Sequence, residues 1–127
     1  MLKGLIWQAD SFGSPENVIT LKEHIFAPPS AGRIIVRVAA AGVAMPDVLL
    51  LQGAYPGVNN PPITPGQEVV GEVVEVAPHS AFRVGDRVMG MTPFSDGLGG
   101  CAEFAYVNEA KAILAPTFSL TRKPRVF

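Results

Sequence analysis

Short apolar runs, most with a two-residue period and bounded by glycine or proline, cover most of the chain. The clearest is Gly32–Ala41, in which every second residue from Ile34 to Val38 is apolar. This period is typical of a β-strand with one buried face. Short strands joined by turns predict an all-β barrel or sandwich. Runs of this kind predict further strands at Leu2–Gln8, Asn17–Phe26, Glu68–Ala77, Arg87–Thr92, Cys101–Val107 and Ala112–Leu114.

One segment carries the signals of a helix instead. Pro46 suits the first helical position, and Asp47 favours the positive end of the helix dipole. Gly53 can take the left-handed conformation just beyond the last turn. The predicted helix is short, and residues 53–67 follow it as a proline-rich loop. A loop of about 15 residues without regular structure is uncommon unless it has a function.

Composition narrows the functional classes. The chain has 127 residues, 48% hydrophobic and 17% charged, which is typical of one globular domain. Ten basic residues against eleven acidic ones give a net charge of −1. This balance argues against nucleic acid as a partner, because sequence-independent binding needs a positive surface. Residues 117–127 contain three basic residues and no acid, so the tail differs in composition from the rest.

The single cysteine, Cys101, excludes an internal disulfide. No histidine or basic residue stands beside it in sequence to lower its pKa, so we expect an inert thiol in a strand. The chain shows neither a secretory signal nor a run of about 20 apolar residues that could span a bilayer. These observations predict a soluble cytoplasmic protein without a membrane partner.

Four motifs follow one another in a distinctive order. They are Ala40–Val43 with Asp47 and then Gly53–Gly57; Pro65–Gly71; Phe82–Val88; and Gly99–Phe104. In this order they resemble the medium-chain dehydrogenase/reductase superfamily, and within it the zinc-free, quinone-oxidoreductase-like branch.

The resemblance implies a mainly β fold, a GroES-like β-barrel with one or two short helices. In the family this domain forms the substrate side of a cleft, and a Rossmann domain holds NADPH or NADH on the other side. No Gly-x-Gly-x-x-Gly fingerprint follows a strand here, so no Rossmann domain is expected within this sequence. We expect a GroES-like domain over residues 1–116 and a divergent basic tail over 117–127, as a truncated or recombined gene would encode.

The resemblance also bears on zinc. Zinc-dependent relatives have a cysteine and a histidine at positions that Ala44 and Gln67 occupy here. Alanine has no ligand atom, and an amide is a poor substitute for imidazole. We therefore expect no metal site.

By resemblance, six residues are candidates for the substrate and cofactor cleft. The Tyr55 hydroxyl could contact the nicotinamide or the substrate carbonyl, or the ring could simply cover the helix. A buried Glu68 could line the cleft floor, or its carboxylate could accept hydrogen bonds from nearby backbone amides, as burial of an unpaired charge is costly. The first-turn Asp47 is expected to be structural. No residue is assigned a certain catalytic role, and the six candidates are Ala44, Met45, Tyr55, Gln67, Glu68 and Phe94.

Two functions follow from these observations. The first is the substrate-side domain of an NAD(P)H-dependent, zinc-free quinone or enone reductase, which is inactive and binds no cofactor as this chain alone. The second is a stand-alone GroES-like module that binds a ligand or self-associates without redox activity. Apolar surface around Met45, Tyr55 and Phe94, or the tail, would favour a homodimer.

Overall fold

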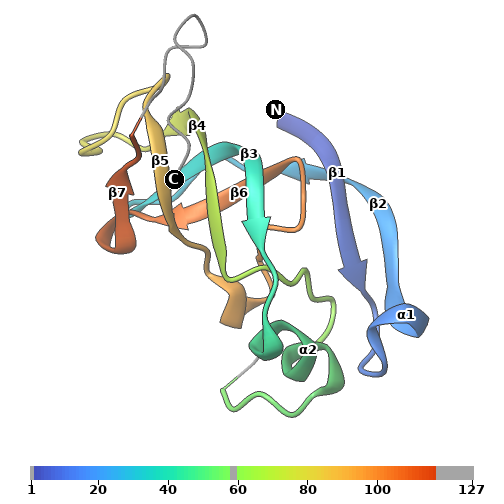
Figure 1. Ribbon diagram of the computed structural model, residues 1–127. Helices are drawn as coiled ribbons and strands as arrows, with labels where there is room; N and C mark the ends of the chain where they lie inside the picture. Colours follow the sequence, from blue (N-terminus) through green and yellow to red (C-terminus); the bar gives the residue numbers. More distant parts are fainter. Residues whose placement is uncertain (1, 58–59, 117–127) are drawn as a thin grey trace, which may run out of the picture.

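The computed structural model describes residues 2–57 and 60–116, which form a mainly β fold with two short helices (Figure 1). The strands are β1 (Leu2–Ala9), β2 (Ile19–Phe26), β3 (Arg33–Gly42), β4 (Glu68–Val76), β5 (Arg87–Met91), β6 (Phe104–Asn108) and β7 (Ala112–Leu114). The helices are α1 (Pro15–Val18) and α2 (Met45–Gln52), with 3-10 turns η1 (Phe94–Asp96) and η2 (Glu109–Lys111).

The strands form two antiparallel sheets. β1 and β2 pair as a hairpin, and the other five strands form a sheet in the order β6-β3-β4-β5-β7. Isolated bridges join the hairpin to the rest of the molecule at Ile6↔Ala102 and Ala9↔Ile63. The predicted mainly β, GroES-like fold class is confirmed, although the described strands do not close into one continuous barrel.

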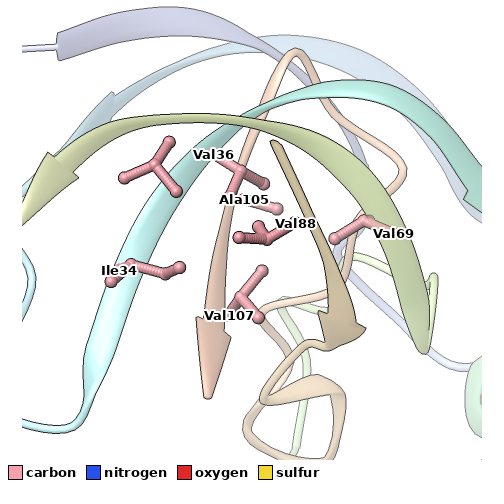
Figure 2. Packing of buried hydrophobic residues seen from close by; sticks show 7 residues of the cluster. Ile34, Val36, Val69, Val88, Ala105 and Val107 are labelled. Atoms are coloured by element: carbon pink, nitrogen blue, oxygen red, sulfur yellow. The ribbon is translucent and has the colours of Figure 1, made fainter. Parts of the chain in front are cut away.

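The five-stranded sheet encloses the main core (Figure 2). Its members are small β-branched residues and one alanine, which fit a pleated surface without strain. None of them is more than 5% exposed. The cluster consists of Ile34, Val36, Val69, Val73, Val88, Ala105 and Val107.

β3 is buried on both faces. Ile34 and Val36 belong to the main core, whereas Ile35 belongs to a second cluster with Phe26 and Phe104. The hairpin covers this second face, so Ile35 is fully buried. The alternation in the sequence predicted one buried face, and the hairpin buries the second face as well.

The helix prediction is confirmed, because α2 begins at Met45 and Gly53 ends it with a φ of 77°. Two predicted strand starts are wrong. The strand predicted to begin at Asn17 begins at Ile19, because the preceding residues form the helical turn α1. Pro15 occupies the first turn of α1, where proline is favourable. β6 begins at Phe104 rather than Cys101, because the backbone N–H of Cys101 bonds to a loop carbonyl, that of Pro65.

Candidate functional site

Three chain segments meet at one edge of the larger sheet. Gly42 at the end of β3 pairs with Glu68 at the start of β4, and Glu68 pairs with Met91 at the end of β5. The residues that extend these three strands therefore lie together. We call residues 42–45, 66–68 and 91–94 the site edge; it contains five of the six predicted cleft residues.

Asp47 holds two parts of the site edge together. Its Oδ2 accepts a hydrogen bond from the Ala44 N–H at 2.9 Å, and its Oδ1 accepts one from the Gly66 N–H at 2.8 Å. The side chain is buried, and two backbone donors compensate for its lost hydration. Asp47 thus has the backbone partners expected of a structural first-turn acid.

Thr92 completes this network, and the sequence analysis did not identify it. Its hydroxyl donates to the Gly66 carbonyl at 2.6 Å, and its N–H donates to the Gln67 carbonyl at 2.8 Å. The side chain is only 1% exposed. A threonine at the end of a strand carries no distinctive sequence signal, so only the fold reveals this role. The network fixes the backbone on both sides of Gln67.

Glycines let two of the recognised motifs touch directly. The N–H groups of Gly100 and Cys101 donate to the carbonyls of Gly66 and Pro65 at 2.9 and 3.0 Å. Gly66 has a φ of +111°, and a Cβ there would lie 2.7 Å from the Gly100 nitrogen. A Cβ on Gly99 would lie 2.2 Å from the Pro65 oxygen. The glycines of these motifs are therefore required for packing of backbone against backbone.

Tyr55 lies next to the site edge. Its ring meets that of Phe94 edge to face, with centroids 5.7 Å apart. Both rings are half-buried against a cluster that includes Leu50 and Ile63. Met45, at the start of α2, is 66% exposed. The structure thus gives Tyr55 the packing role, while the predicted contact of its hydroxyl with nicotinamide or substrate stays a prediction.

The expected burial of Glu68 is wrong. Both interpretations of this residue assumed a buried carboxylate, but the side chain is exposed, and it makes no hydrogen bond within the described residues. Period 2 explains the difference, because Val69 faces the core and Glu68 must then face outward. Glu68 lines an open groove of about 740 Å³ together with Met89, Met91 and other residues of the sheet.

Cys101 lies against Gly66 of the site edge, half-buried in a bend. Burial raises the pKa of its thiol above the ordinary value, and the negative charge of Asp47 raises this pKa further. The thiol therefore stays protonated at neutral pH, as an inert cysteine requires.

The described residues do not fit a whole dinucleotide. Their strands pair antiparallel within both sheets, so they contain no strand–helix–strand unit that could hold a pyrophosphate at a helix N-terminus. Residues 2–57 and 60–116 also bring no three His, Cys, Asp or Glu side chains together as metal ligands. The zinc-free character stays a prediction based on Ala44 and Gln67. In the same part of the chain, no helix is long and apolar enough to cross a membrane.

The alcohol dehydrogenase GroES-like domain family matches residues 30–117, and the chain belongs to this family. Quinone oxidoreductase from Mus musculus is 38% identical over 96 residues, which cover 74% of this chain and 28% of the mouse protein. The chain therefore spans less than a third of that relative.

Solved structures agree with this assignment. A quinone oxidoreductase from Pseudomonas syringae is 28% identical with a TM-score of 0.79, over 89% of this chain and 34% of that one. A mycobacterial protein solved in complex with NADPH is 26% identical with a TM-score of 0.75, again over 89% and 34%. The predicted membership of the medium-chain dehydrogenase/reductase superfamily, in its quinone-oxidoreductase-like branch, is confirmed.

Proposed function

We propose that this chain forms the substrate-side wall of an NAD(P)H-dependent, zinc-free quinone or enone reductase. The observation that carries the proposal is the site edge, where three strand ends bring Ala44 and Gln67 together. By the family resemblance, zinc-dependent relatives have their ligands at these two positions. The exposed Met45 and the Tyr55–Phe94 pair add an apolar and aromatic wall, which suits a flat, uncharged substrate.

In this proposal the chain positions and shields the substrate, and NAD(P)H supplies the hydride when it is bound. Asp47 and Thr92 keep the wall rigid, because each ties a loop of the site edge to its neighbour. The Tyr55 hydroxyl makes no hydrogen bond within the described residues, which leaves it able to donate to a carbonyl oxygen. The Tyr55→Phe variant, which lacks the hydroxyl, would test that contact.

A direct experiment follows. The purified 127-residue chain is mixed with NADPH and a quinone, and oxidation of NADPH is measured by absorbance. We expect no turnover, because the described residues offer no pyrophosphate site to hold the cofactor against the quinone. Turnover by the pure chain would contradict the proposal. Metal analysis after dialysis is expected to find no stoichiometric zinc, and one zinc per chain would contradict the zinc-free assignment.

A second candidate is a stand-alone module that self-associates. The supporting observation is exposed apolar surface at the site edge, where Val43 is 70% exposed and Met45 is 66% exposed. Burial of such surface contributes about 25 cal/mol per Å². The predicted homodimer is tested by sedimentation at tens of micromolar concentration, where a clean monomer would exclude it. The part of the prediction that involves the tail lies outside the described residues, and the cytoplasmic location stays a prediction.

A further inference from the structure

The hairpin carries polar side chains on its inner face. Residues that pair directly across an antiparallel ribbon share a face, so Gly4, Ile6 and Gln8 lie on the same side as Phe26 and His24. Ile6 and Phe26 on this side are buried against the second cluster, which makes it the inner side. Gln8 and His24 are half-buried there, where the pattern alone would favour apolar residues.

These two side chains have no partner of their own. The other long polar residue of the inner face, Lys22, forms an ion pair with Asp10. By contrast, within residues 2–57 and 60–116 the imidazole of His24 and the amide of Gln8 make no hydrogen bond. Their polar atoms are not fully buried, so they are free to bond to water or to a ligand that enters this side of the hairpin.

Both side chains line a cavity of about 330 Å³ between the hairpin, β6 and the loop before it. This volume lies at the small end of the range for ligand pockets, about 300–1,000 Å³. Most of the wall is apolar or aromatic, and it includes Leu98 and Phe104. Ala102 and two glycines line it as well, so small residues leave the space open. None of the six predicted cleft residues lines this cavity.

The side chains that line the cavity indicate which class of ligand it would bind. His24 and Phe26 meet edge to face with centroids 4.7 Å apart, and Phe26 meets Phe104 at 5.9 Å, so three packed rings form part of the cavity wall. A planar aromatic ring fits such walls. A neutral imidazole and a carboxamide each offer both a donor and an acceptor, which suits a hydroxyl group. The one carboxylate among the described lining residues, Asp96, already pairs with Arg33 at 2.9 Å, and none of those lining residues is a lysine or arginine, so the wall favours a neutral ligand.

We propose that this hairpin cavity, lined by Gln8, His24, Ala102 and their aromatic neighbours, is a binding site for a small neutral phenol. The site is separate from the site edge, and it does not depend on the proposed reductase function. Tyr106 is not the anchoring group, because its hydroxyl already donates to the Ala27 carbonyl at 2.6 Å.

The test uses the full 127-residue chain with 2-naphthol as the probe. Calorimetry is expected to give a Kd of about 0.1–1 mM, typical of a ligand of this size. Amide shifts in nuclear magnetic resonance spectra are expected at Leu98, Ala102 and His24. Shifts confined to Met89 and Met91 of the open groove would overturn the proposal, as would the absence of binding to folded protein.

Three variants sharpen the test. His24→Phe keeps the ring against Phe26 but removes the hydrogen bond, and we expect about tenfold weaker binding. Ala102→Leu fills the cavity, and we expect binding to become undetectable. Ala40→Leu fills the separate groove by a matched change and is expected to leave the Kd unchanged. Equal affinity of wild type and a folded His24→Phe variant would overturn the assignment, even if Ala102→Leu fails to fold.

Discussion

The five-stranded sheet and the β1–β2 hairpin are built from similar residues but packed in different ways. The sheet encloses a valine-rich cluster with almost no exposure. The hairpin exposes Trp7 and Ile25 by 44% and 59% on its outer face, and its inner face covers a cavity. We therefore expect the sheet and the site edge to contribute most of the free energy of unfolding. The hairpin leaves surface and space that a ligand or partner can use.

Two glycine variants separate close backbone packing from backbone strain. Gly66→Ala and Gly85→Ala both force alanine into a positive φ, +111° and +98°. Only at Gly66 does the new Cβ meet backbone, at 2.7 Å from the Gly100 nitrogen. We expect a loss of unfolding free energy of about 4 kcal/mol for Gly66→Ala and about 1 kcal/mol for Gly85→Ala. Urea unfolding measures both, and similar losses would show that the motif glycines serve conformation alone.

The next two variants replace an isoleucine of the main core and an isoleucine on the outer face of the hairpin. Ile34→Ala leaves a cavity in a fully buried cluster, and we expect a loss of about 3 kcal/mol. Ile25→Ala removes a side chain that is 59% exposed, and we expect a loss below about 1 kcal/mol. Thermal or urea unfolding distinguishes them. An equal loss would mean that the outer face of the hairpin is covered in solution, as in a dimer.

The Asp47 network is expected to be weaker than either core packing or close backbone contact. Asp47→Ala leaves the N–H groups of Ala44 and Gly66 without their side-chain acceptor, and we expect a loss of about 2 kcal/mol. Hydrogen exchange should locate the effect, with faster exchange of these two amides than in wild type. Unchanged exchange at Gly66 would contradict the role assigned to Asp47.

The smallest expected effect is on the pH dependence of the alkylation rate of the Cys101 thiol. Burial and the Asp47 charge raise the thiol pKa, so the alkylation rate should rise with pH at a midpoint above that of a short peptide. The proton is retained to higher pH in the folded state, so this group lowers stability only as pH rises above the ordinary thiol pKa. Asp47→Asn should lower the midpoint but leave it above the peptide value. A midpoint at or below the peptide value would refute the assignment.

The sequence predicted much of the fold because period 2 and turn residues are local signals. It located α2 and Gly53, and each strand to within a few residues. It misplaced the start of β6, since the N–H of Cys101 donates to the Pro65 carbonyl and its carbonyl accepts from the Trp7 N–H, both far away in sequence. The prediction also took Glu68 to be buried. The alternating pattern of β4 did not indicate which of its two faces is buried, and its first residue, Glu68, lies on the exposed face.

Less of the candidate site than of the fold could be predicted from the sequence. The positions of Ala44 and Gln67 came from the family resemblance, and their meeting at one edge depends on the register of three strands. The bond from Asp47 to Gly66 spans 19 residues and joins a helix to a loop. Gln8 and His24 each look ordinary in sequence, and only the pairing of β1 with β2 brings them to one cavity.

The proposed role of residues 1–116 is that of a working, metal-independent substrate wall. The most direct test joins these residues to the cofactor-binding part of a quinone oxidoreductase and measures NADPH-dependent quinone reduction before and after treatment with a chelator. We predict turnover that the chelator leaves unchanged. A folded chimera that binds NADPH without reducing any quinone or enone, or that works only with added zinc, would contradict the account.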